Sequence, residues 1–383
     1  MAIRFKRAII FATAVGAVLS GGAALAATPA PPIPIKWTES TAAPMGVTRL
    51  DGAVVDKKVY FLGFRAADAS TDGSVWYYDL ATKTYVDTGT DLPVPISNYS
   101  VAVLKDANGT GLYTFGGRDA SGAIITTVQV YYPATNTASV VESDPWPGTT
   151  PAGCTSLPAT GVAVVGNLGY VIGGISFSSA VPPCIDDQSS QVWAFDPKAA
   201  DGAKWSERPS LNVARGYLAT AVVGKTIYAI GGDINNAGTL VAQANVEAWK
   251  AGKGGSWDDA SYSDLPVACD ETQAFGFQKG QLGGTVTLAG CGQWPVALAN
   301  VQQYDIATDT WSDLAPLNEA RRNHLGVNIG SSKKPKLFLL GGYNSDGSVT
   351  LATSELGAKS KKSADQAAPQ QRIPSVTQRL PLS

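Results

Sequence analysis

An apolar, strand-like run that ends on a pair of glycines recurs along the whole chain. 'LYTFGG' ends at Gly117, and the same pattern returns as 'YVIGG', 'YAIGG' and 'FLLGG', with 'YFLGF' and 'TLAGCG' as degraded copies. The intervals between the six first glycines are 53, 57, 58, 59 and 51 residues. Self-similarity at one period indicates a repeat architecture whose units are small supersecondary structures. The first glycines are Gly63, Gly116, Gly173, Gly231, Gly290 and Gly341.

A second signal follows the glycines in fixed order: a strand ending in an aromatic residue, a polar turn, and often another aromatic. 'VQQYDIATDTW' places Tyr304 and Trp311 seven residues apart, and 'VWYYDLATKTY' places Tyr78 and Tyr85 at the same spacing. Alternating apolar runs broken by Gly, Asn, Asp and Pro are typical of strands joined by hairpins. Each unit therefore holds about four strands, and such a sheet buries both faces by stacking radially against its neighbours.

These marks resemble the kelch repeat, with its double glycine followed by a tyrosine and a tryptophan. The resemblance covers about residues 35–356 and implies an all-β fold, a six-bladed kelch β-propeller with four-stranded antiparallel blades. The last repeat stops at 'TSEL' without its closing strand, while an unmatched 'IKWTES' containing Trp37 precedes the first repeat. We therefore predict that the N-terminal strand around Trp37 joins the last blade and closes the ring, which leaves no unpaired edge between first and last blades.

The two ends of the chain have a different composition from the repeats. Residues 1–26 combine a basic start, an apolar run and a small-residue 'ALA', which is typical of a secretory signal peptide; an uncleaved membrane anchor is the alternative. We expect a Pro-rich linker at 27–34, the propeller at 35–357 and a disordered polar tail at 358–383. The predicted location is extracellular, or periplasmic in a Gram-negative host, with no stable membrane insertion after signal cleavage.

Four cysteines in an exported chain suggest two disulfides. Cys154 and Cys269 precede the glycines of the third and fifth repeats, and Cys184 and Cys291 follow them. We therefore predict one bridge inside each of these repeats, Cys154 with Cys184 and Cys269 with Cys291. The alternative is four buried free thiols, and no cysteine spacing resembles a zinc site.

The charge balance limits the classes of partner. The chain has 29 Lys and Arg against 31 Asp and Glu, a formal net charge of −2. This gives no electrostatic case for nucleic acid or for an anionic membrane. We expect a monomer whose partner is an extracellular or periplasmic protein or glycan.

Functional residues of a propeller are expected on the loops around the central channel. One loop set follows the glycine pairs and the other precedes each inner strand, and arginine recurs in both. Arginines with tyrosines, an asparagine and one acid suit an anionic or polyhydroxyl ligand, because a guanidinium binds carboxylates in a bidentate manner. The structural alternative is that these arginines pair with carboxylates and carbonyls at blade junctions. The candidate ligand-binding residues are Arg49, Arg65, Arg118, Arg215, Tyr217, Asp233, Arg322, Asn323, His324 and Tyr343; the same loops also carry Asn98, Tyr99, Gln293 and Arg321.

The histidine count argues against several chemistries. The kelch family includes copper-radical oxidases, whose copper needs two histidines, two tyrosines and a cysteine crosslinked to one tyrosine, and this chain has one histidine, His324. A lone histidine also weakens a Ser-His-Asp hydrolase or a histidine-rich metal site. A glycosidase needs two carboxylates, and Asp233 has no partner that the sequence reveals. We therefore assign no catalytic residue, metal or cofactor, and the question of enzymatic activity stays open with a leaning against it.

Two functions of different classes remain. The first is a secreted, non-catalytic kelch-repeat propeller that binds a protein or glycan through its loop face. The alternative is a metal-independent sugar-acting enzyme, since some exported bacterial six-kelch propellers are sialic acid mutarotases and this chain is similar in blade number and in its arginine-bearing loops. A closed site holding Arg215, Arg322 and Asp233 would favour the enzyme, and an open face with exposed aromatics would favour the binder.

Overall fold

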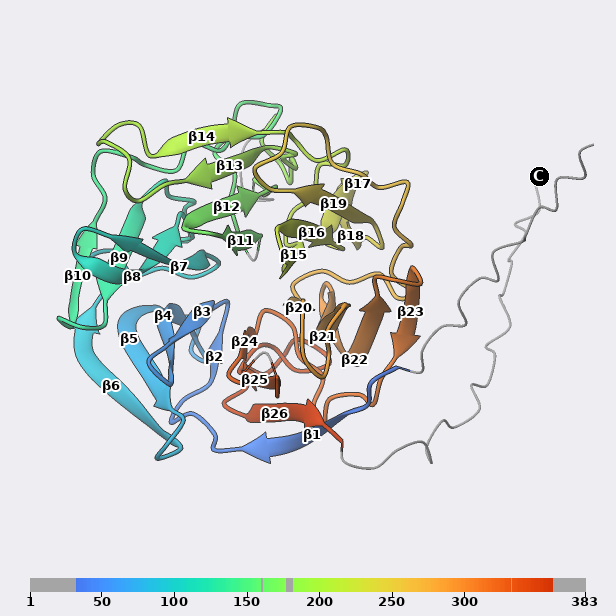
Figure 1. Ribbon diagram of the computed structural model, residues 1–383. Helices are drawn as coiled ribbons and strands as arrows, with labels where there is room; N and C mark the ends of the chain where they lie inside the picture. Colours follow the sequence, from blue (N-terminus) through green and yellow to red (C-terminus); the bar gives the residue numbers. More distant parts are fainter. Residues whose placement is uncertain (1–31, 160, 177–181, 332, 361–383) are drawn as a thin grey trace, which may run out of the picture.

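The structure is a computed structural model that describes residues 32–159, 161–176, 182–331 and 333–360. The predicted signal peptide lies outside the described residues, as does all but the start of the predicted tail. Figure 1 shows a ring of small antiparallel sheets around a central axis, with no helix in the described part of the chain. Among these residues there is accordingly no helix able to cross a membrane. The all-β, six-bladed propeller predicted from the repeats is confirmed.

Each blade is an antiparallel sheet whose strands follow one another from the centre to the edge. Blades 2, 3, 5 and 6 have four strands in one sheet, whereas blade 4 has three strands and a separate hairpin. Blade 1 comprises β2 (Val47–Thr48), β3 (Gly52–Val55), β4 (Lys58–Ala66), β5 (Thr71–Asp79) and β6 (Thr84–Asp91); blade 2 comprises β7 (Ser100–Asp106), β8 (Gly109–Phe115), β9 (Val128–Tyr132) and β10 (Thr137–Val140). Blade 3 comprises β11 (Val162–Val165), β12 (Leu168–Ile172), β13 (Val192–Phe195) and β14 (Trp205–Arg208); blade 4 comprises β15 (Ala219–Val223), β16 (Thr226–Ile230), β19 (Val246–Lys250) and the hairpin of β17 (Asp233–Asn236) and β18 (Thr239–Ala242). Blade 5 comprises β20 (Gln273–Phe277), β21 (Thr285–Gln293), β22 (Val296–Asp305) and β23 (Thr310–Asp313); blade 6 comprises β24 (Leu325–Asn328), β25 (Lys336–Leu340), β26 (Ser354–Lys359) and β1 (Ile35–Ser40).

The aromatic signal of the repeat is a cross-strand pair in the outer hairpin of a blade. Tyr304 lies opposite Trp311 across β22 and β23, and Tyr78 lies opposite Tyr85 across β5 and β6. Their ring centroids are 4.9 and 4.8 Å apart, respectively. A seven-residue spacing across a tight turn brings the two rings to the same rung of the ladder, where cross-strand aromatic pairs stabilise a sheet.

The ring closes through its two ends. β1 pairs antiparallel with β26, so the first strand of the chain is the outermost strand of the last blade (Figure 1). Trp37 lies opposite Gly357, and a Cβ added at Gly357 would stand 2.5 Å from the tryptophan ring. Trp37 is 5% exposed and packs in the apolar cluster between blades 5 and 6. The predicted closure by the strand around Trp37 is confirmed.

The repeat glycines follow the second strand of blades 2, 3, 4 and 6, and they lie at a register shift within β4 and β21 in blades 1 and 5. The first glycine of every pair has a positive φ, between 55° and 78°. At the second position, Gly342 also has a positive φ, and a Cβ there would lie 2.5 Å from the carbonyl oxygen of Arg322. A side chain at this point would collide with the loop that enters the same blade, so the chain approaches itself as only glycine allows.

Candidate functional site

A belt of backbone hydrogen bonds surrounds the propeller axis and holds five side chains there. The residue at the same repeat position in five blades has a positive φ, between 44° and 55°. Successive members are joined by N–H to O=C hydrogen bonds of 2.8–3.0 Å, from Tyr217 through Glu271, Asn323 and Arg49 to Asn98. Blade 3 has Pro158 at this position. We call these five residues the central belt; they are Arg49, Asn98, Tyr217, Glu271 and Asn323.

A second set of side chains lies beside the belt because of a repeated β-bridge. In each blade, the residue before the belt position pairs with the residue after the second glycine position. The predicted loop sets therefore meet, and they meet at the centre. The paired residues are Thr48 with Arg65, Ser97 with Arg118, Leu157 with Ile175, Gly216 with Asp233, Asp270 with Gly292, and Arg322 with Tyr343.

Blades 6, 1 and 2 make one side of the centre cationic. The Arg322 guanidinium carbon lies 4.7 Å from the centre of the Tyr343 ring, and that of Arg49 lies 5.8 Å from the same ring. Arg49 donates to the side-chain oxygen of Asn98 at 3.3 Å, and Arg118 donates through Nε to the carbonyl of Gly122 at 3.0 Å. Burial and the neighbouring charges of Arg49 and Arg65 hold the pKa of Arg118 below its ordinary value. Cations crowded in this way stabilise a bound anion.

Blades 4 and 5 make the opposite side acidic. Asp233 and Asp270 are each 1% exposed, and Glu271 is 6% exposed. Burial, followed by the charges of Asp270, Glu271 and Asp186, raises the pKa of Asp233 well above its ordinary value. Burial, followed by the charge of Glu271, raises the pKa of Asp270 to about 8. The backbone N–H of Trp294 and the charge of Arg322 act in the opposite direction and are outweighed. At neutral pH the Asp270 carboxyl group is therefore mostly protonated, and burial shifts the pKa of Asp233 in the same direction, as expected for buried like charges.

The two sides are joined by a buried ion pair and by one tyrosine. Arg322 donates to the Glu271 carboxylate at 2.5 Å, and both side chains are less than 10% exposed. Tyr217 is 7% exposed, and burial, followed by the negative charge of Glu271, raises its pKa. The charges of Arg49 and Arg118 also act on the Tyr217 hydroxyl, which places it between the cationic and acidic sides. We define the central cluster as Arg49, Arg118, Tyr217, Asp233, Asp270, Glu271, Arg322 and Tyr343.

Several polar atoms of this cluster lack a hydrogen-bond partner within the described residues. They include Oδ1 of Asp233 and Nε of Arg49, and the carboxyl group of Asp270 has no partner there besides the backbone N–H of Trp294. Buried polar groups in native proteins are usually satisfied, so a group of unsatisfied ones needs an explanation. A polar ligand with an anionic end and hydroxyl groups would satisfy donors on one side and carboxyl groups on the other.

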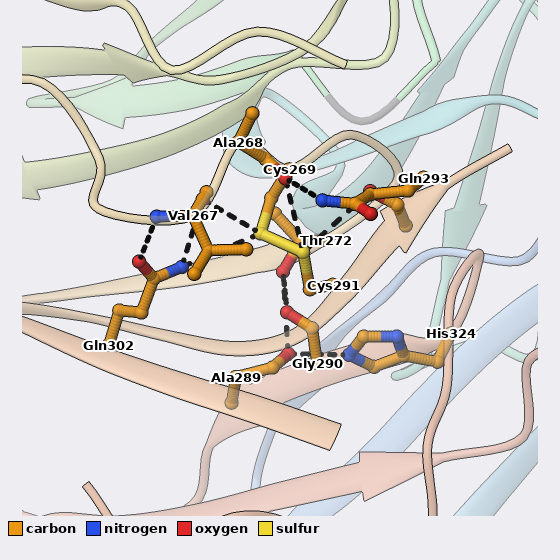
Figure 2. The surroundings of a disulfide bond; sticks show 11 residues. Val267, Ala268, Cys269, Thr272, Ala289, Gly290, Cys291, Gln293, Gln302 and His324 are labelled. Carbon is orange, nitrogen blue, oxygen red and sulfur yellow. Dashed lines mark hydrogen bonds between the residues drawn. A yellow bond between two sulfur atoms is a disulfide. The ribbon is translucent and has the colours of Figure 1, made fainter. Parts of the chain in front are cut away.

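A disulfide fixes the entrance to the acidic side. Cys269 and Cys291 form a disulfide with a Cα–Cα distance of 5.1 Å. Cys269 directly precedes Asp270, and Cys291 directly precedes Gly292, the residue that pairs with Asp270. Figure 2 shows Thr272 donating to the carbonyl of Gly290 below this bond, and His324 against the carbonyl of Ala289. The other bridge joins Cys154 to Cys184 in blade 3. Both predicted pairings are confirmed.

The structure separates the predicted site residues into two groups. Arg49, Arg118, Tyr217, Asp233, Arg322 and Tyr343 belong to the central cluster; Arg65 lies in the outer part of the cationic side, and Asn323 belongs to the belt. Arg215 and His324 instead lie inside the blades. Arg215 is fully buried and bonds Glu247 and the carbonyls of Gly231 and Asn245, which is the structural alternative for this arginine.

His324 is 1% exposed and its Nε2 lies 3.0 Å from the carbonyl oxygen of Ala289. Burial, and then the charge of Arg321, lowers the pKa of His324 to about 3. The imidazole is therefore neutral at physiological pH and is enclosed by the junction of blades 5 and 6.

Sequence reasoning missed Asp270 and Glu271. They stand in 'CDET', at the repeat positions that Arg322 and Asn323 occupy in 'RRNH'. Aligning the fifth repeat on its glycine would have placed them at these positions. The fifth repeat has Cys291 in place of its second glycine, however, so its alignment with the other repeats is less evident from the sequence. These two residues supply the carboxyl partners that the sequence did not reveal for Asp233.

The other features with ligand-binding potential are weaker. No cluster of three or more His, Cys, Asp or Glu that could hold a metal ion occurs among the described residues. A cavity of about 590 Å³ on the outer edge of blades 2 and 3 is lined by charged residues that include Asp106, Asp201 and Lys204. Its charges already have partners, because Asp106 accepts from Tyr113 and Lys204 pairs with Asp201. The central cluster is therefore the best-supported site.

Comparison with known proteins agrees with this architecture. No family model matches the chain. β-Scruin of Limulus polyphemus is 27% identical over 252 residues, which are 64% of this chain and 24% of scruin; α-scruin of the same animal is 29% identical over 167 residues, 43% of this chain and 16% of that protein. The chain thus spans a quarter or less of the curated relatives it matches. The solved structure of YjhT superposes with a TM-score of 0.62 at 16% identity, covering 82% of this chain and 95% of that one.

The fold and the repeat marks define the class of protein to which the chain belongs. Six blades, a positive-φ glycine at the same position in each blade and closure by the first strand make it a β-propeller. Together with the similarity to the scruins, these features support a kelch-repeat propeller.

Proposed function

We propose that this propeller is an exported glycan-binding protein that holds an acidic sugar at the central cluster. The observation that carries the proposal is the division of the cluster into a cationic side, with Arg49, Arg118 and Arg322, and a side with the carboxyl groups of Asp233 and Asp270. A sugar carboxylate would bind the guanidinium groups, and sugar hydroxyls would bind the carboxyl groups. Neutral carboxyl groups both donate and accept hydrogen bonds, so they suit hydroxyls and do not repel an anion.

Export is part of this proposal. The two disulfides support an oxidising compartment, where such bonds form and persist. The apolar start of the chain supports a signal peptide on sequence grounds alone.

The test is thermal unfolding of the mature chain with a panel of acidic and neutral sugars. An acidic sugar should raise the melting temperature by mass action, and its neutral counterpart should not. Arg49→Gln with Arg118→Gln should abolish the shift, because it removes two of the three guanidinium groups of the cationic side, and both side chains are only half-buried. Arg208→Gln, on β14 at the edge of blade 3, is the matched control and should retain it. Equal shifts in the control and the double variant would contradict the proposal.

A second candidate is a sugar-acid mutarotase. The observation that favours it is the pair of buried carboxyl groups of Asp233 and Asp270, whose pKa values are raised, on the side of the centre opposite the arginines. Anomer exchange needs a proton donor and acceptor near the ring oxygen. Saturation-transfer NMR of the two anomers measures this activity. Exchange that is accelerated by the wild type and abolished in Asp233→Asn would support the enzyme, and exchange at the uncatalysed rate would leave the non-catalytic binder.

A further inference from the structure

The surface around the central cluster carries an unusual set of exposed apolar side chains. Five large hydrophobic side chains are exposed among the described residues, and all five follow the glycine pairs of blades 3 to 6, on the loops that lead out from the cluster. Trp294 is the largest of them and is 54% exposed. Exposed apolar patches next to a polar site mark binding surfaces. The five are Ile185, Val241, Trp294, Val296 and Val349.

Trp294 is placed rigidly rather than on a loose loop. It forms, with Pro295, the two-residue turn between β21 and β22, where Gln293 pairs with Val296. The same end of β21 is fixed by the Cys269–Cys291 bridge, two residues before Gln293. The hairpin also contacts blade 6, since Ala297 donates its backbone N–H to the carbonyl of Ser345 at 2.9 Å.

The same turn is attached to both sides of the central cluster. The carbonyl of Pro295 accepts from Nε of Arg322 at 3.1 Å. The backbone N–H of Trp294 interacts with the carboxyl group of Asp270. The backbone of this turn therefore lies beside the cluster, and 54% of the Trp294 side chain is exposed.

We infer that Trp294 is a stacking platform for a second sugar, so that the ligand is an acid-terminated oligosaccharide rather than a free sugar acid. This inference rests on the proposed function, because the terminal acidic residue is the one held at the central cluster. The apolar face of a pyranose ring packs on an aromatic face, and tryptophan offers the largest such face with few rotatable bonds. Val296, two residues further on in the same hairpin, and Val349 in the blade 6 loop extend the apolar surface.

The exposure of Trp294 favours an extended ligand over a free sugar acid. A free sugar acid would have its carboxylate on the arginines and its hydroxyls on the carboxyl groups, and would need no surface outside the cluster. The turn that carries Trp294 is joined to Arg322 through the carbonyl of Pro295, so an exposed side chain on this turn is within reach of the next sugar of a chain. An exposed tryptophan outside the cluster would contact the second sugar of an acidic oligosaccharide, and a monosaccharide has no such second sugar.

The experiment compares two pairs of ligands by isothermal titration calorimetry of the mature protein: N-acetylneuraminic acid with sialyllactose, and galacturonic acid with digalacturonic acid. In at least one pair the longer ligand should bind about tenfold more tightly than its monosaccharide. Trp294→Ala should remove this advantage and leave the monosaccharide affinity unchanged. Trp294→Phe should keep most of the advantage, and Val241→Ala in the blade 4 hairpin is the control that should keep all of it.

A fluorescence measurement gives an independent readout. All nine tryptophans lie in the described part of the chain, and Trp294 alone among them is exposed. Acrylamide should therefore quench chiefly Trp294, and the longer ligand should protect it while the monosaccharide does not.

The outcomes separate this inference from the proposed function. Monosaccharide binding with no gain for the longer ligand would overturn the platform and leave the acidic-sugar site intact. A loss of both affinities in Trp294→Ala with full retention in Trp294→Phe would move Trp294 into the monosaccharide site and would also overturn the platform. No binding of any acidic sugar would overturn both.

Discussion

At the scale of single residues, the repeats differ in how they hold the chain where it enters a blade. In blade 4, Glu247 accepts from the backbone N–H groups of Asn212 and Val213 and pairs with the buried Arg215 at 2.9 Å. In blade 6, Glu355 does the same for residues 318 and 319 and pairs with Arg321 at 3.0 Å. Each carboxylate therefore satisfies the entering loop and one guanidinium that no water reaches.

Blades 2 and 5 solve the same problem without charge. Gln129 and Gln302 occupy the position of the glutamates, and their amides bond both the N–H and the carbonyl of Val94 and Val267, respectively. The position of the buried arginines is then taken by Ile96 and Cys269. These four blades thus carry either Arg with Glu or an uncharged residue with Gln, as expected if a lone buried charge is costly.

This pattern predicts a non-additive result. Glu247→Gln alone should destabilise the protein by about 3–5 kcal/mol, because Arg215 keeps its charge in a buried site without a counter-ion. Arg215→Ile with Glu247→Gln, which copies blade 2 into blade 4, should recover most of that loss. Urea unfolding of the single and double variants measures the coupling. Additive losses would show that the two residues act independently.

At this scale, the sequence does not show which residue of each loop faces the propeller axis. The repeat located the loop before each inner strand, so Arg49, Tyr217 and Arg322 could be predicted as central. It could not separate Arg321 from Arg322, because neighbouring side chains in an extended segment point to opposite sides. It could not separate Arg215 from Tyr217 either, because the positive φ of Tyr217 breaks the extended pattern. The belt residue, with its positive φ, decides which of them faces the axis, and no residue type marks it: Arg, Asn, Tyr, Glu and Asn occupy it.

At the scale of strands, closure is the feature that the sequence determined best. The missing strand of the last repeat and the extra strand before the first one had to complement each other, and β1 pairs with β26 over six residues from Ile35 to Ser40. The hydroxyl of Ser40 also lies 3.1 Å from that of Tyr78 in blade 1. The less regular part is blade 4, whose outer edge has only an isolated bridge between Ala248 and Asp258. The irregular outer edge of blade 4 corresponds to a looser aromatic spacing in the sequence of the same repeat.

Closure gives a stability prediction. Trp37→Ala should lower the free energy of unfolding by about 3–5 kcal/mol, because the indole fills the junction of blades 5 and 6. The urea midpoint of the variant measures this, with the exposed Trp294→Ala as a tryptophan control that should cost little. An unchanged midpoint for Trp37→Ala would show that β1 does not close the ring.

At the scale of the whole molecule, the propeller is a neutral frame with a strongly divided centre. The net charge of −2 gives no sign of this division. Three consecutive blades supply the arginines, two supply the acids, and blade 3 separates them with the apolar pair of Leu157 and Ile175. The repeat predicts the frame because every blade must obey the same packing. It does not predict the division, because the side chains at the axis are free of that constraint.

The measurement that tests this account most directly is the pH dependence of acidic-sugar affinity between pH 6 and 9.5. The sugar carboxylate and the arginines keep their charges throughout this range, and Glu271 is paired with Arg322. Asp270, whose pKa is raised to about 8, is neutral at the lower end and anionic at the upper end. Ionisation removes a hydrogen-bond donor and places a negative charge beside the ligand, so affinity should fall as the pH rises.

We predict constant affinity up to about pH 7.5 and a loss of about tenfold by pH 9.5, measured by calorimetry on the wild type. Asp270→Asn, which stays neutral, should bind with little change across the same range. An affinity that is independent of pH in the wild type, or that falls equally in Asp270→Asn, would contradict the claim that an acidic sugar lies between the arginines and the protonated carboxyl groups at the propeller axis.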